Sequence, residues 1–298
     1  NLYVLLIADS GLRKGFAAAL AKTLVTLVDS TRVISGRNSI QAIIKEMSTA
    51  VTRPKKAPLT KSHAFIVSGE LSTTFVEDPN VFTILTDLHD GHYHTEGWKN
   101  TLKGTGVESL KDISVTLLGA VNPPLFRSMI TKKDLTGGFI ARTVIVEETK
   151  RSLKNSLITA PAKTLDFSEL VDYIRELSKL EGKFCLDAGA AAFFNEWYNA
   201  FDPEKMGDET GTANRIHDQI LKVSMLMSLS CSHDLTISTE HIQEAMNLLG
   251  HAVKAAGSIG KGNGLTDFAP KIKIVLDEIE KGENYRVLRS FLLNKHWG

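Results

Sequence analysis

The chain has 298 residues, of which 43% are apolar and 23% are charged, and its formal net charge is +1. These values are typical of a globular protein long enough for two or three domains. Its apolar runs all fall short of the ~18 residues that a membrane span needs, so we expect a cytoplasmic protein without a membrane partner. The two cysteines, Cys185 and Cys231, exclude a cysteine-based zinc site. The near-neutral charge excludes a uniformly basic surface for nucleic acid, which leaves local patches or oligomerisation as routes to DNA.

The first elements in chain order are an apolar strand over 2–7, a loop over 8–15 and a helix over 15–29. This is the layout of a phosphate-binding loop, in which backbone N–H groups, the helix dipole and a lysine hold a nucleotide. Against the pattern G-x-x-x-x-G-K-[ST], the chain keeps Lys14 and Ser10-Gly11 but departs at the other fixed positions, which are Ala8, Arg13 and Gly15. The residues expected to bind nucleotide are Ser10, Gly11, Leu12, Arg13, Lys14, Gly15 and Phe16. The alternative is an ordinary strand-to-helix turn with a solvated lysine.

Further strands over 64–67, 113–121 and 139–146 alternate with helices over 38–50 and 78–90. Such alternation predicts an α/β domain with a parallel sheet over residues 1–150. The basic, proline-bearing segment 52–58 is expected to be an exposed loop, and 149–161 a linker out of the sheet domain.

The strand over 64–67 leads into Ser68-Gly69-Glu70. A nucleotide hydrolase needs a carboxylate at such a strand end, to activate water or to hold Mg²⁺, and Glu70 is the one acid there. Ser68 and Gly69 stand where an aspartate would hold magnesium, and Gly15 replaces the loop hydroxyl, so metal binding is doubly weakened. The alternative is that Glu70 caps the following helix.

Two polar residues mark the later strands. Asn122 follows the strand over 113–121, and beside the phosphate loop it would hold the attacking water or sense the terminal phosphate; an Asn-Pro turn is the simpler interpretation. Arg142 lies in an otherwise apolar segment, where a buried or interfacial guanidinium requires an anion. That anion would be a phosphate on a neighbouring subunit, or else Glu147 or Glu148 of the same chain.

From 162 to 257 the apolar residues recur with a helical period, which predicts an all-α bundle. The glycine-rich segment 257–264 is expected to be a hinge, and 265–298 to hold two helices that would start a winged helix-turn-helix. Lys99, Lys103 and Lys111 lie around a glycine-containing turn and are expected to contact DNA, the alternative being a solvated loop. The histidine-rich segment 89–96 is expected to be a surface loop rather than a metal site.

In this order and spacing, four segments resemble the P-loop ATPase family found in phages and prophages beside primases, which is related to primase-helicase replication proteins. The segments that carry the resemblance are 10–15, 68–72, 117–123 and 137–142. More loosely, 212–222 and 237–245 resemble the helical lid of AAA+ helicases of the minichromosome maintenance kind. The resemblance implies a RecA/AAA+-like core over 1–150, a lid over 162–257, and ATP and Mg²⁺ as cofactors. It also implies that Arg215 senses the nucleotide from the lid and that Arg142 is an arginine finger.

Taken together, these interpretations predict an ATP-dependent DNA helicase or translocase of phage-type replication, a hexameric ring in the cytoplasm of a bacterial host. Lys14 would bind the outer phosphates, Glu70 would activate water and Asn122 would position it. Its partners would be single- or double-stranded DNA and a primase or polymerase domain. The main alternative, favoured by Gly15 and Gly69, is a non-hydrolysing or weakly hydrolysing ATP-binding assembly or loader protein. A nucleotide-independent DNA-binding regulator that uses the terminal helices is a more distant alternative.

Overall fold

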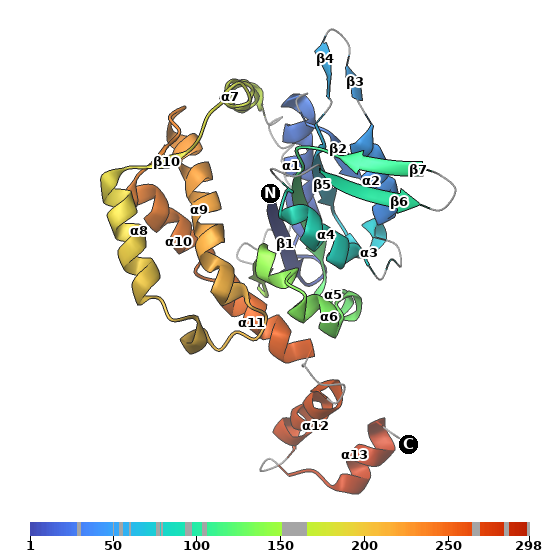
Figure 1. The fold of residues 1–298 in the computed structure, drawn as a ribbon. Coiled ribbons are helices and arrows are strands. Elements are labelled where there is room, and N and C mark those ends of the chain that lie inside the picture. The colour runs from blue at the N-terminus through green and yellow to red at the C-terminus, as the bar shows by residue number, and fades with distance from the viewer. Residues whose placement is uncertain are drawn as a thin grey trace.

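Five parallel strands form the central sheet of the protein (Figure 1). In the order β2-β5-β8-β1-β9, they are β2 (Val33–Ser35), β5 (His63–Ser68), β8 (Ser114–Val121), β1 (Leu2–Ala8) and β9 (Thr143–Glu148). The structure is a computed structural model, and it describes all residues except 29–30, 50, 54–55, 60, 76–77, 79, 93–96, 103–105, 151–165, 264–268, 283–285 and 297–298. The predicted α/β fold with a parallel sheet is confirmed.

The apolar sequence of β1 explains its place inside the sheet. Tyr3, Leu5 and Ile7 are buried in the main core on one face, whereas Leu2 and Val4 pack against the helical part of the chain on the other. A strand that is apolar on both faces must be covered on both. Accordingly, β1 pairs with β8 on one side and with β9 on the other.

Helices cover both faces of the sheet. The main-core face carries α2 (Ile40–Ser48), α3 (Leu71–Thr74), α4 (Val81–His89), α5 (Pro123–Met129) and α6 (Lys132–Thr136). On the opposite face, α1 (Lys14–Val28) packs Ala18 against Phe65 and Val67 of β5. Both faces of β5 are therefore buried, as a central parallel strand requires.

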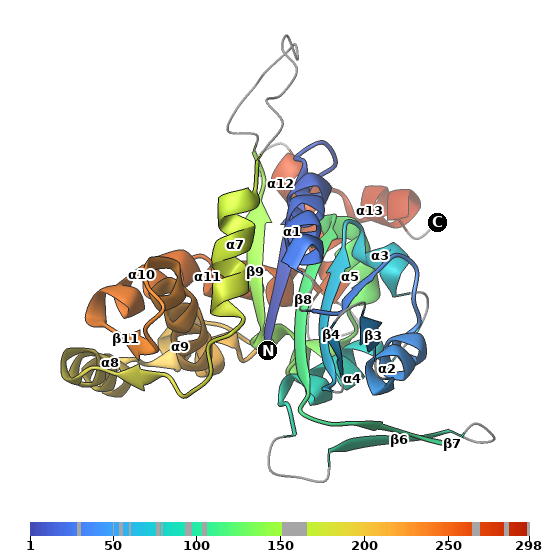
Figure 2. The same cartoon turned by 90° about the horizontal axis from the view of Figure 1, so that it is seen from above.

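The helical part lies beside the edge strand β9 (Figure 2). It consists of α7 (Ser168–Leu177), α8 (Ala188–Ala200), the 3₁₀ turn η2 (Pro203–Met206), α9 (Thr212–Cys231), α10 (Thr239–Leu249) and α11 (Ala252–Asn263). It is not purely helical, because β10 (Cys185–Leu186) and β11 (Thr236–Ile237) form a short parallel pair. Val144 of β9 lies in the core of this part, so it is packed onto the sheet. The predicted linker over 149–161 falls mostly outside the described residues.

The predicted hinge over 257–264 is wrong for 257–263, because α11 continues as a helix to Asn263; the last residue of that range lies outside the described residues. Ala255, Ala256 and Ile259 on this helix are buried in the main core, and that packing outweighs the low helix propensity of the neighbouring glycines. Two further helices follow, α12 (Ala269–Lys281) and α13 (Arg289–His296), where two helices were predicted.

Two antiparallel hairpins extend from the sheet domain. The segment predicted as an exposed loop over 52–58 instead contributes to β3 (Val51–Arg53) and β4 (Lys56–Leu59); a proline is tolerated there because a two-stranded ribbon consists of edge strands. The second hairpin joins β6 (Trp98–Leu102) to β7 (Gly106–Leu110). Among the described residues, no helix is long and apolar enough to cross a membrane.

Candidate phosphate-binding site

The loop between β1 and α1 has an unusual backbone. Gly11 and Arg13 have φ angles of 89° and 61°, and a positive φ is uncommon for a residue with a Cβ atom. The N–H groups of Phe16 and Ala17 both donate to the carbonyl oxygen of Arg13, at 3.0 and 3.3 Å, so α1 begins immediately after the turn. The loop therefore ends in a helix N-terminus, whose first N–H groups and dipole favour an anion.

The loop lies at the point of the sheet where the chain changes the side to which it crosses over. From β1 the chain crosses to β2 at one edge, and from β8 it crosses to β9 at the other edge. Ligands of open parallel sheets bind outside the carboxyl ends of the strands at such a point. The strand that ends at Asn122 lies beside the loop strand, because β1 pairs with β8. Lys14, the first residue of α1, is half-buried at this edge.

Glu70 lies at the same edge of the sheet. The pairing of β5 with β8 reaches Ser68↔Gly119. Because β8 lies between β5 and β1, the distance from β5, which ends just before Glu70, to the loop strand β1 is two strand spacings, or about 10 Å. Glu70 occupies the N-cap position of α3, but its side chain makes no capping hydrogen bond. Its Oε1 accepts a hydrogen bond of 3.4 Å from the hydroxyl of Ser72. The helix-capping alternative for this side chain is therefore not supported.

The two glycines that replace the expected magnesium ligands lie against each other. An ideal Cβ atom on Gly15 would be 3.4 Å from the carbonyl oxygen of Gly69, and one on Gly69 would be 3.9 Å from the Cα of Gly15. The neighbouring Ser68 is 3% exposed, and its hydroxyl accepts a hydrogen bond of 2.5 Å from the hydroxyl of Thr74. The positions that would carry a hydroxyl and a carboxylate thus meet in space but carry neither.

These residues do not make a site that would hold a magnesium ion through protein side chains alone. Mg²⁺ requires oxygen ligands in a near-octahedral arrangement, and Glu70 is the one carboxylate at this strand end. Within the described part of the chain, no group of three or more His, Cys, Asp or Glu side chains could hold a metal ion.

A pocket of about 250 Å³ opens beside the contact between the two glycines. It lies between the N-terminal half of α1 and the ends of β2 and β5. Lys22 and Glu70 are the charged residues that line it. Hydroxyl groups supply most of its other polar lining, and they come from Ser35, Ser68, Thr73 and Thr74.

Asn122 lies at the end of β8, where its side chain caps a helix. Its Oδ1 accepts a hydrogen bond of 2.8 Å from the N–H of Leu125, and Pro123 follows as the first residue of α5. This geometry supports the Asn-Pro turn, and it leaves the side-chain NH₂ as the group with which Asn122 would contact a ligand.

Arg142 lies at the opposite edge of the sheet. It ends the 3₁₀ turn η1 (Ile140–Arg142), which leads into the start of β9. Its Nε and Nη2 donate to the carboxylate of Asp90 at 3.0 and 2.7 Å, and it is 8% exposed. A guanidinium paired in this way within its own chain does not support the arginine-finger expectation. Its partner is neither Glu147 nor Glu148, because β9 carries those two residues to the carboxyl edge.

The other expected basic residues also lie away from the loop. Arg215 is in the first turn of α9, which packs on η1, so it belongs to the amino-terminal edge as well. Lys99 lies on β6, and Lys111 lies between β7 and the start of β8 at that same edge. Lys103 lies outside the described residues. The structure therefore places Gly15, which follows Lys14, and Glu70 on one pocket. It does not bring Arg142, Arg215, Lys99 or Lys111 to that pocket.

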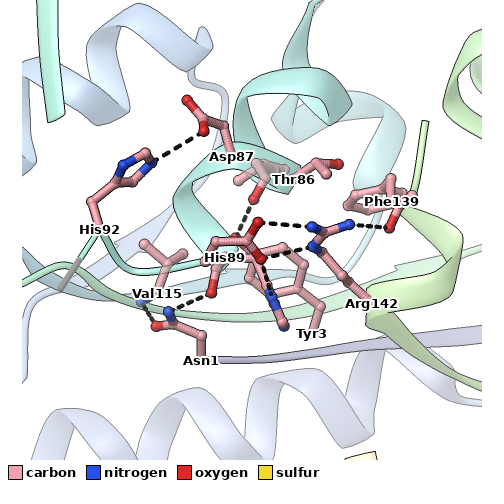
Figure 3. A network of polar contacts seen from close by, with 12 residues as sticks. Asn1, Tyr3, Thr86, Asp87, His89, His92, Val115, Phe139 and Arg142 are labelled. Carbon is pink, nitrogen blue, oxygen red and sulfur yellow. Dashed lines mark hydrogen bonds and ion pairs between the residues drawn. The ribbon is translucent and has the colours of Figure 1, made fainter. Parts of the chain in front are cut away.

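A polar network surrounds Arg142 (Figure 3), and two contacts join it to the helical part. Nζ of Lys222 on α9 lies 3.1 Å from Nε2 of His89, and the side-chain NH₂ of Gln219 donates to the carbonyl of Arg142 at 2.8 Å. Burial, with the charge of Lys222, lowers the pKa of His89 to about 3. Burial raises the pKa of Asp90, but the hydrogen bonds and charge of Arg142 outweigh it and hold that pKa below its usual value.

Two features of these sites were missed at the level of the sequence. Asp90 ends the predicted helix over 78–90 and also begins the part of the chain expected to be a surface loop, and nothing in its spacing indicates Arg142 as its partner. The position of Lys22 could have been predicted, because it follows Gly15 by about two helical turns and therefore lies on the same face of α1.

No protein family model and no curated protein matches the chain.

Proposed function

We propose that this chain is an ATP-binding module of the RecA/AAA+ type in a phage-type DNA replication complex, and that it hydrolyses ATP weakly or not at all. The observation that carries the proposal is the contact of the loop-to-helix junction at Gly15 with the strand end at Gly69. Positive groups for the phosphates come from the turn at Gly11 to Arg13, the N-terminus of α1 and Lys14. The five-stranded parallel sheet is compatible with a RecA-like core.

Binding is supported better than turnover. Gly15 and Gly69 offer no metal ligand, Asn122 is engaged in capping α5, and Arg142 and Arg215 lie at the other edge of the sheet. An ATPase owes much of its rate to groups that stabilise charge developing in the transition state. Of the four residues expected to act in catalysis, Glu70 is the one that lies at the edge of the loop with a side chain not engaged in capping a helix.

The second proposal is a motor. In it, the chain forms a hexameric helicase or translocase that hydrolyses ATP with Mg²⁺ to move along DNA, together with a primase or polymerase partner. Two observations favour it. The carboxylate of Glu70 is not used as a helix cap, and a hairpin, β6–β7, is present where a DNA contact was expected.

Calorimetric titration with ATP and steady-state turnover, with and without single-stranded DNA, separate the two proposals. We expect binding with turnover well below ~1 s⁻¹, the low end for enzymes, and no stimulation by DNA. Turnover that DNA raises severalfold would favour the motor. Absence of ATP binding by a folded protein would refute both.

A further inference from the structure

We infer that the nucleotide site binds ATP without a divalent cation, and that the ammonium group of Lys22 supplies the positive charge that a metal would bring. The inference rests on the proposed function, because it concerns the same site. It comes from the way in which Gly15, Gly69, Lys22 and Glu70 line one pocket.

Neither glycine is required by the backbone or by lack of space. Neither has a positive φ, and a Cβ atom on either would meet its neighbours at ordinary contact distances of 3.4 Å or more. A serine or threonine at position 15 and an aspartate at position 69 would therefore start from allowed geometry. The glycines leave their own two positions without a metal ligand and widen the pocket between α1 and β5.

Lys22 is placed to enter that space. It follows Gly15 by seven residues, about 10 Å along the helix axis, and therefore lies on the same helix face. Helical side chains lean towards the N-terminus, which directs Lys22 towards the loop. The residues between them that line the pocket are Ala18 and Ala19, whose small side chains do not obstruct its path.

The charge balance of the pocket favours this role. Glu70 would repel a phosphate, and an interposed cation removes that repulsion. A lysine suits the task, because its ammonium is a compact point charge on a flexible stem. Lys14 holds the loop side of the phosphates, and Lys22 approaches from the side of Glu70.

The test is ATP binding by calorimetry, in EDTA and in Mg²⁺, on the whole chain. For the unmodified protein we expect the two dissociation constants to agree within about threefold. Lys22→Gln should weaken binding in EDTA by about tenfold, and Lys22→Arg, which keeps the charge, should stay within about threefold. Lys45→Gln changes a surface lysine on α2 and serves as the matched control, with no change expected.

A second variant tests whether the glycines are the reason that no metal is needed. Gly69→Asp adds a carboxylate at the glycine contact, and once circular dichroism shows that it is folded, it should bind ATP about tenfold more tightly in Mg²⁺ than in EDTA. Equal affinities in this variant would overturn the role given to the glycines. Unmodified protein that binds ATP only with Mg²⁺, or Lys22→Gln that binds in EDTA as tightly as the control, would overturn the inference and leave the proposed function standing. No binding under either condition would refute the proposed function itself.

Discussion

Asp90 and Arg142, 52 residues apart in the chain, are joined by two hydrogen bonds, one from Nε and one from Nη2 of the guanidinium to the two carboxylate oxygens. The two partners differ in exposure, since the side chain of Arg142 is 10% exposed and that of Asp90 is 54% exposed. Removal of the carboxylate would leave a buried charge without its partner, whereas removal of the arginine would leave a carboxylate that water can solvate. The pair therefore fixes η1 against α4 at the edge of the sheet opposite the phosphate loop.

Asp90→Ala should lower the free energy of unfolding by about 2–4 kcal/mol, because an unpaired buried guanidinium is costly. Urea unfolding measures it. The control is Asp172→Ala, which breaks the exposed pair with Arg175 on α7 and should cost less than about 1 kcal/mol. Equal losses in the two variants would contradict the structural role of the Asp90 pair. ATP affinity should be unchanged in both.

Stability should depend on pH through His89. Its pKa is about 3 in the folded protein and near 6.5 in an unfolded chain, so between these values the unfolded state binds one more proton. The stabilisation is complete above pH 6.5 and falls by up to about 1.4 kcal/mol per pH unit as the pH drops towards 3. Urea unfolding from pH 7 to 4.5 should show a weaker slope in His89→Gln than in the unmodified protein. Identical slopes would mean that His89 is protonated in the native state.

Lys14→Ala should weaken ATP binding by at least tenfold and leave the thermal unfolding midpoint unchanged. Lys14 begins α1 beside the loop and is expected to make a charge-assisted contact with the outer phosphates. Calorimetry and a melting curve on the same sample separate binding from folding. Unaltered affinity would remove the phosphate-loop assignment.

Glu70→Gln should keep ATP affinity within about threefold and abolish any residual turnover. The amide preserves the shape of the side chain but is not a base at neutral pH. A sensitive phosphate-release assay with labelled ATP compares the variant with the unmodified protein. If the residual rate survives the substitution, Glu70 does not activate water.

Phe16→Ala should weaken binding of ATP about tenfold but not that of inorganic tripolyphosphate. Phe16 is 65% exposed in the first turn of α1, where its ring can stack on a base, an interaction of about 1–3 kcal/mol per base in proteins that bind single strands. Leu27→Ala is the control, since Leu27 is also exposed but lies near the other end of α1. An equal loss for both ligands would show that Phe16 acts on the loop and not on the base.

Local pattern was enough to predict the main elements. The apolar runs that became β1, β5 and β8, and the helices α1, α2 and α4, follow from residues whose side chains must be covered on one or both faces. The hairpin β3–β4 and the helical course of α11 through its glycines did not follow, because pairing and core packing there outweigh local propensity.

The sequence by itself determined the α/β order of the first half, the loop with Lys14, and the carboxylate at the end of β5, because each is encoded by neighbouring residues. Only the tertiary structure decided which of these residues meet. The strand order brings Gly15 against Gly69 and carries Arg142 to Asp90 at the opposite edge. Such contacts depend on how strands far apart in the chain are ordered in the sheet. A buried charge such as that of Arg142 forms its ion pair with the residue that this order places beside it.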